Sequence, residues 1–261
     1  MMIIILILIY FMLSLTAGGE RTAKTIVTIS LNCLLLALAI LLISTNVPVI
    51  PVAVVLFTGI SLITIFFQNE TNDKTKAAFL SVMMIILVFT AIIVFFVYKA
   101  HLQGMSIMPG AKIRESNGYS GDINVNMVMI QITVMVLILT GSVTDAAVSI
   151  SSGIYEVLRR NPDTDVSGLF RSGMNIGADI LNSNVNTLFF IMLGESMIMF
   201  INYMQYHSFA ALINSKEFSQ ETISIALSAF ACVLAIPVTS AVCAAFFKRK
   251  AGRSGKRPEK A

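Results

Sequence analysis

Long apolar stretches alternate with short polar connections along almost the whole chain. Most stretches are close to 20 residues long, the length that a helix needs to cross the hydrocarbon core of a bilayer. The pattern predicts seven membrane-spanning helices, at residues 1–17, 25–44, 48–67, 77–98, 124–150, 184–205 and 223–247. No Lys or Arg precedes the first apolar run, so we interpret it as a retained helix rather than a secretory signal peptide.

The composition narrows the class of protein further. Of 261 residues, 56% are hydrophobic and only 12% are charged. Soluble domains carry about 25% charged residues, so a soluble enzyme, a nucleic-acid-binding domain and a disordered protein are excluded. A porin-type barrel is excluded because its strands alternate instead of running continuously apolar. We therefore predict an all-α, polytopic bundle formed by residues 1–247, followed by a basic cytoplasmic tail at 248–261.

The distribution of Lys and Arg predicts the orientation of this bundle. Alternate connections place 14 Lys and Arg residues on one side, seven of them in the tail, and four on the other side. Because cytoplasmic loops carry the excess of positive charge, the C-terminus is predicted to be cytoplasmic. With seven spans, the N-terminus is then outside. The tail is expected to be solvated and drawn to anionic lipids of the inner leaflet.

One acidic residue stands out in the fifth predicted span. Asp145 shares a helix face with Gly141, Ser149, Ser152 and Glu156, because these residues recur at spacings of three and four. Small and hydroxylated residues on one face allow close contact between membrane helices. The helix should emerge into the cytoplasm, where Glu156 can pair with Arg159 or Arg160.

Two interpretations of Asp145 stay open at this point. A charged side chain inside a membrane span is costly and is by default a candidate functional group. Asp145 is then either a structural carboxyl that bonds to a neighbouring helix or a group that takes up and releases a proton during transport.

A second acidic residue, Glu195, lies in the sixth predicted span. Asn184 and Thr187 share its face by the same spacing, whereas Asn186 and Asn182 point roughly the opposite way. A span with polar groups on two faces is expected to pack between neighbours. Glu195 also has two interpretations, as a structural carboxyl or as part of an ion pathway.

The segment between these spans, residues 161–182, carries an apolar stripe that predicts an amphipathic helix along the cytoplasmic interface. Asp163 or Asp165 is positioned to cap it. Gly173 and Gly177 form a small-xxx-small strip, which is typical of tight packing between helices. The segment serves either as a connector or as a coupling element.

No motif of a hydrolase or of a cofactor site is present in the sequence. The three cysteines lie inside apolar runs, and the two histidines stand far apart, so no disulfide framework and no metal site is predicted. We therefore expect a protein that is not an enzyme, needs no cofactor and binds no nucleic acid.

Three stretches resemble the YibE/F family of bacterial membrane proteins. They are Gly141–Glu156, Arg171–Ile180 and Asn184–Leu188, and the chain is most similar to the YibF type. These stretches place an Asp in a glycine-rich span, acidic and Arg residues at the end of its helix, an amphipathic segment, and Asn and Thr at the start of the next span. This order of features has a more distant resemblance to SecD/SecF and to resistance–nodulation–division permeases. By that resemblance, Asp145 would carry the proton-coupling carboxyl, and Asn184, Asn186 and Thr187 would fall where polar residues of the next helix lie. Those permeases have large extracytoplasmic domains, which are missing from this chain.

Taken together, these features predict a subunit of an ion-coupled, proton-driven transporter or export complex in the bacterial plasma membrane. The expected surroundings are the lipid bilayer and a sister protein of the YibE type, in a homo- or hetero-oligomer. The alternative is a membrane scaffold that assembles or stabilises such a partner and does not transport.

Overall fold

The computed structural model describes residues 2–45, 47–69, 71–102, 126–206 and 208–254. The regular structure within these ranges is helical, which confirms the predicted all-α bundle. The elements are α1 (Met2–Ser44), α2 (Val49–Leu62), the π-helix η1 (Ile63–Phe67), α3 (Asp73–Lys99), α5 (Met127–Arg160), α6 (Val166–Tyr206), α7 (Phe209–Ile213) and α8 (Lys216–Ser254). Most of the predicted external connection 99–123 and the end of the basic tail lie outside the described residues.

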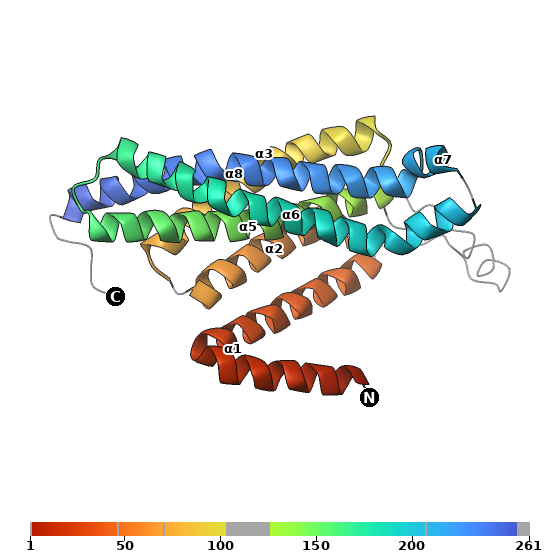
Figure 1. The fold of residues 1–261 in the computed structure, drawn as a ribbon, viewed down its shortest axis with the longest axis horizontal. Coiled ribbons are helices and arrows are strands. Elements are labelled where there is room, and N and C mark those ends of the chain that lie inside the picture. Colours follow the sequence, from red (N-terminus) through yellow and green to blue (C-terminus); the bar gives the residue numbers. More distant parts are fainter. Residues whose placement is uncertain (1, 46, 70, 103–125, 207, 255–261) are drawn as a thin grey trace.

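The core of the bundle is formed by α3, α5, α6 and α8 (Figure 1). One apolar cluster joins α2, α3, α5 and α8 and contains the fully buried side chains of Ile93 and Leu139. A second cluster joins the C-terminal halves of α5 and α8 and the N-terminal half of α6, where Ile154 and Leu169 are fully buried. The helices that carry the predicted site residues are therefore part of the packed core of the described bundle.

The helix α1 has two arms that meet in a V (Figure 1). They meet at Gly19, whose φ of 57° and ψ of −143° lie in a region that glycine adopts more readily than other residues. The second arm packs against α2 and η1, where Asn32 donates a hydrogen bond from Nδ2 to Thr64 Oγ1 at 3.1 Å. The V separates the first two predicted spans.

Within the described residues, six helices are long and apolar enough to cross a membrane. They are the second arm of α1 (Gly18–Ser44), α2 with η1 (Val49–Phe67), α3, α5, α6 and α8 up to Arg249. They correspond to six of the seven predicted spans. The remaining one, residues 1–17, is the shorter first arm of α1, and its crossing stays a prediction.

The helix ends that the Lys and Arg count assigns to the cytoplasm lie toward one end of the long axis of the bundle (Figure 1). They include the kink of α1 at Gly19, the start of α3 and the turn between α5 and α6. The starts of α5 and α8 lie at the opposite end, where α7 contacts α8 (Figure 1). This grouping agrees with the predicted topology, and its orientation in the membrane stays a prediction.

Cysteine labelling in intact cells tests both the orientation and the first crossing. In a chain whose native cysteines are replaced, a cysteine at Met2 should react with an impermeant maleimide from outside, and one at Ser254 should react only after the cells are opened. If residues 1–17 do not cross, both positions should be labelled from the same side. Labelling of Ser254 from outside would overturn the predicted orientation.

The predicted interfacial helix 161–182 and the sixth predicted span form one uninterrupted helix, α6. Asp165 caps its start, because the Oδ1 atom accepts a hydrogen bond from the backbone N–H of Gly168 at 2.8 Å. At 1.5 Å per residue, α6 is about 60 Å long, about twice the thickness of the hydrocarbon core. Its first turns therefore extend beyond the core although no break separates them from the span.

The helix α8 is also longer than the predicted seventh span. It begins at Lys216, directly after the five-residue helix α7, and continues through Pro237 to Ser254. The region predicted as the loop 207–221 is therefore largely helical in its described part, and the first residues of the predicted tail continue α8. Glu221 thus lies on a helix face instead of in a loop.

Candidate functional site

Asp145 lies within the membrane-crossing part of α5. It is about 28 Å along the helix from the capping residue Asn126 and about 16 Å from Glu156, at 1.5 Å per residue. The side chain is exposed at the surface of the bundle, whereas Thr144 and Ala146 on either side are buried. Among the described residues Asp145 forms no ion pair, and Arg159 is about 21 Å away along the same helix.

The nearest polar neighbours of Asp145 come from α5 and α8. Cys232 of α8 lies close enough for the charge of Asp145 to act on its thiol, and the Ser142 side chain lies within hydrogen-bonding reach of the same thiol. Cys232 is only 1% exposed. The carboxyl therefore stands at the edge of the α5–α8 interface, with one side toward buried polar groups and the other toward the surface.

The polar face of α5 that was predicted to pack is largely open. Gly141 and Ser149 are exposed, Ser152 is half-buried, and a methyl group added to Gly141 would meet no atom within 4 Å. The buried hydroxyl is instead that of Ser151, which donates to the backbone carbonyl of Lys74 at 2.7 Å and so ties α5 to α3. The face of Asp145 is thus a surface of the described bundle.

Glu195 lies near a carboxyl that the sequence analysis did not select. Glu221 of α8 lies close enough for the charge of Glu195 to act on it. Nearby, Tyr203 donates a hydrogen bond to Glu217 at 3.3 Å. The sequence signal that could have identified this start of α8 is the capping residue Ser215, whose Oγ atom accepts a hydrogen bond from the backbone N–H of Phe218 at 3.3 Å.

The other predicted coupling residues lie on different sides of α6. Asn184 is half-buried, and its Nδ2 atom has no hydrogen-bond partner among the described residues. Thr187 is exposed, and its hydroxyl donates a hydrogen bond to the backbone carbonyl of Ser183 at 2.8 Å. Asn186 is exposed on the face of α6 that points away from the bundle. None of the hydrogen bonds found among the described residues joins these side chains to Asp145. Their part in ion coupling therefore stays a prediction.

Gly173 and Gly177 lie where α6 meets its neighbours most closely. A Cβ atom on Gly173 would be 2.4 Å from the Ser240 Oγ atom, and one on Gly177 would be 2.3 Å from the Ile236 Cγ2 atom. Gly153 of α5, which the spacing analysis did not select, would meet Ile176 at 2.8 Å. The glycine strip therefore brings α6 against α8 within one chain.

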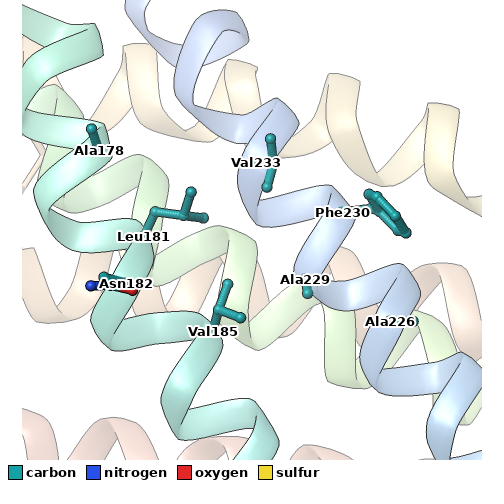
Figure 2. A pocket seen from close by; sticks show the side chains of 8 residues that line it. All are labelled: Ala178, Leu181, Asn182, Val185, Ala226, Ala229, Phe230 and Val233. Atoms are coloured by element: carbon teal, nitrogen blue, oxygen red, sulfur yellow. The ribbon is translucent and has the colours of Figure 1, made fainter.

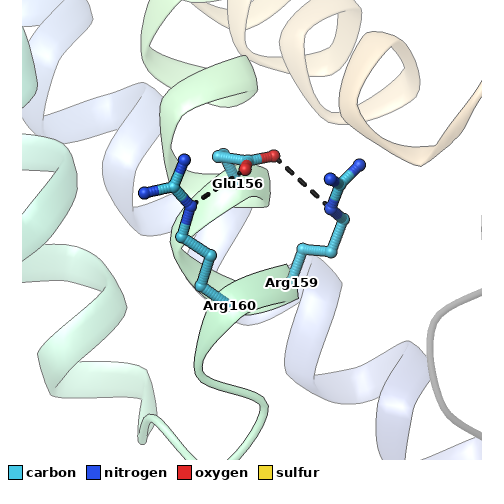
Figure 3. A network of polar contacts seen from close by, with 3 residues as sticks. All are labelled: Glu156, Arg159 and Arg160. Carbon is cyan, nitrogen blue, oxygen red and sulfur yellow. Dashed lines mark hydrogen bonds and ion pairs between the residues drawn. The ribbon is translucent and has the colours of Figure 1, made fainter.

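At the predicted cytoplasmic end, Glu156 is bonded to both arginines (Figure 3). Its carboxylate lies 3.0 Å from the Arg160 Nε atom and 3.6 Å from the Arg159 Nε atom. Lys248 of α8 donates to the carbonyl of Pro162 at 3.2 Å. The Lys248 contact ties α8 to the turn between α5 and α6, whereas the exposed ion pairs lie within α5 and contribute little to stability.

A groove of about 450 Å³ opens between α6 and α8 (Figure 2). Its walls are almost entirely apolar, and Asn182 of α6 is the polar residue among them. Within the part of the chain that the structure describes, no group of His, Cys, Asp and Glu has the arrangement of a metal site.

Comparison with known proteins identifies the family. The family described as YibE/F-like protein matches residues 6–249. No curated protein and no solved structure matches the chain, so the resemblance to SecD/SecF and to resistance–nodulation–division permeases finds no support there. Because the family match covers nearly the whole length, this multi-pass membrane protein belongs to the YibE/F family.

Proposed function

We propose that this protein is the ion-coupling subunit of a membrane transporter or export complex, and that the Asp145 carboxyl takes up and releases a proton during the transport cycle. The observation that carries the proposal is the position of this carboxyl. It lies inside the membrane-crossing part of α5 and has no cationic partner among the described residues. An acidic side chain in such a position costs about 2.5–3.5 kcal/mol in membrane insertion, so a structural role alone accounts poorly for its presence.

The surroundings of Asp145 support proton transfer. Its carboxyl is open on one side and lies beside Ser142 and Cys232 on the other. Buried hydroxyl oxygens without a hydrogen-bond partner among the described residues occur in the same helices, including those of Thr144, Thr239 and Ser240. Because buried polar groups are normally hydrogen-bonded, these hydroxyls are available to a proton pathway between α5 and α8.

The complex that we propose also contains a sister membrane protein of the YibE type, in the bacterial plasma membrane. The external connections predicted for this chain are too short to form a domain that captures cargo. A sister protein with an extracytoplasmic region would supply that part, and this chain would correspond to the YibF type. The alternative, a scaffold that holds such a partner without transporting, makes no use of a carboxyl at this depth.

Proton flux into liposomes tests the proposal. The protein, alone and co-purified with its sister, is reconstituted with a pH-sensitive dye inside, and a potassium diffusion potential drives protons inward. We expect the initial rate to fall to the protein-free background in Asp145→Asn, because an amide cannot exchange the proton. The matched control, Asp163→Asn in the exposed turn before α6, should retain the wild-type rate. A wild-type rate in Asp145→Asn would return Asp145 to a structural role and favour the scaffold.

A further inference from the structure

The outward face of α6 carries a polar stripe that no helix of the described bundle covers. Asn175, Asp179, Asn182 and Asn186 recur at spacings of four, three and four, and all four are exposed. The residues of α6 that are buried against its neighbours, such as Gly177, lie on the other side of the helix. The stripe is thus distinct from the α6–α8 contact and from the face of Asp145 on α5.

The contacts between α6 and α8 place this stripe at a defined depth. Gly177 is level with Ile236, because a Cβ atom on Gly177 would be 2.3 Å from the Ile236 Cγ2 atom. Along α6, Asn182 lies about 7.5 Å beyond Gly177. The helix α8 runs antiparallel to α6, so going back from Ile236 to Cys232 covers about 6 Å in the same direction. Asn182 is therefore nearly level with Cys232 and its neighbour Asp145.

This depth lies inside the hydrocarbon core. The stretch of α5 from Asn126 to Glu156 is about 45 Å long. If a hydrocarbon core about 30 Å thick is centred on this stretch, Asp145 lies inside it, about 9 Å from the nearer edge. Asn186 is about 6 Å closer to the centre than Asn182, and Asp179 is about 4.5 Å nearer the cytoplasm. Two amides thus face outward where lipid chains offer no hydrogen-bond partner.

The chemistry of the stripe indicates what covers it. An amide side chain has both a donor and an acceptor, so an asparagine satisfies a second asparagine placed opposite it. Spacings of four, three and four residues are those of the contacting positions in a two-helix coiled coil. Two copies in the same membrane orientation, related by a two-fold axis along the membrane normal, set α6 parallel to itself and each asparagine opposite its own counterpart.

The neighbouring groove makes room for this approach. Ala178 of α6 and Ala226 and Ala229 of α8 line it, and such small residues allow the backbones of two membrane helices to come close (Figure 2). We propose that the outward face of α6 is the contact surface of a homodimer, with Asn182 and Asn186 hydrogen-bonded across its two-fold axis.

Disulfide cross-linking in native membranes tests this surface. Single cysteines are introduced at Asn182 and Asn186 into the chain that lacks its native cysteines, and copper phenanthroline is added. A disulfide needs Cα atoms within about 7 Å, so both variants should form a species of twice the 28.4 kDa chain mass. The matched control is a cysteine at Ile191, which is exposed on the opposite side of α6 and should stay monomeric.

A second variant separates loss of the contact from loss of folding. Asn182→Leu with Asn186→Leu exposes only apolar atoms to lipid, so the chain should keep its thermal stability as a monomer. When fluorescently labelled protein is placed in lipid nanodiscs, the fluorescence of wild-type particles should bleach in two steps and that of the double variant in one. A monomeric wild type, cross-linking at Ile191 as efficient as at Asn182, or cross-links from Asn182 to a different polypeptide would each overturn the homodimer.

Discussion

Replacing Gly177 by leucine is expected to lower the melting temperature of the protein sharply. The first atom of the new side chain would lie 2.3 Å from the Ile236 Cγ2 atom and 2.9 Å from its Cγ1 atom, so α6 and α8 must move apart. Overpacking of this kind costs about 3 kcal/mol or more. For a chain of this size, that corresponds to a loss of about 6–12 °C in melting temperature, measured by thermal unfolding in mild detergent.

The chain offers a matched control for this substitution. Gly141 is also a helical glycine inside a predicted span, but a Cβ atom there would meet nothing within 4 Å. Gly141→Leu should therefore change the melting temperature little. Ile236→Ala, combined with Gly177→Leu, should restore part of the stability because it removes the atoms that clash. Equal melting temperatures for the two leucine variants would contradict the close α6–α8 contact.

The fold could be predicted largely from the apolar pattern, since the length of a membrane helix is fixed by the bilayer. The apolar pattern did not show that the interfacial helix and the sixth predicted span form one continuous helix, α6. Polar residues between 175 and 187 suggested a change from an interfacial helix to a span, yet no proline or strong breaker occurs there, and the helix continues. Asp165 was a reliable signal for its start because capping is a local interaction.

The candidate site was less predictable, because helical spacing identifies a face but does not say what that face meets. The spacing grouped Asp145 with Gly141 and Ser149, and the structure shows this face to be open. The pairing of Asp145 with Cys232 depends on how α8 is rotated against α5, which no local pattern encodes. Gly177 was identified because small residues at this spacing have a general packing role, although its partner could not be named.

Asp145→Glu should retain proton flux that Asp145→Asn has lost. Glutamate keeps the carboxyl and adds one methylene group, and because the Asp145 side chain is exposed, this addition need not enter the core. The carboxyl would move by about the length of one bond from Ser142 and Cys232, so we expect a rate about tenfold below wild type, equivalent to about 1.4 kcal/mol. The measurement is the initial rate of dye response under the same potassium diffusion potential.

The comparison of the two variants separates proton transfer from assembly. Both should elute from size-exclusion chromatography like the wild type, and Asp163→Glu should transport at the wild-type rate, which shows that a longer acid elsewhere is harmless. If Asp145 carries the proton, the rate of proton flux should decrease in the order wild type, glutamate variant, asparagine variant, because only the first two can bind and release a proton. A scaffold predicts that all three behave alike. If Asp145→Glu were as inactive as Asp145→Asn while assembled normally, the α5–α8 interface would have to hold the carboxyl more tightly than its exposure indicates.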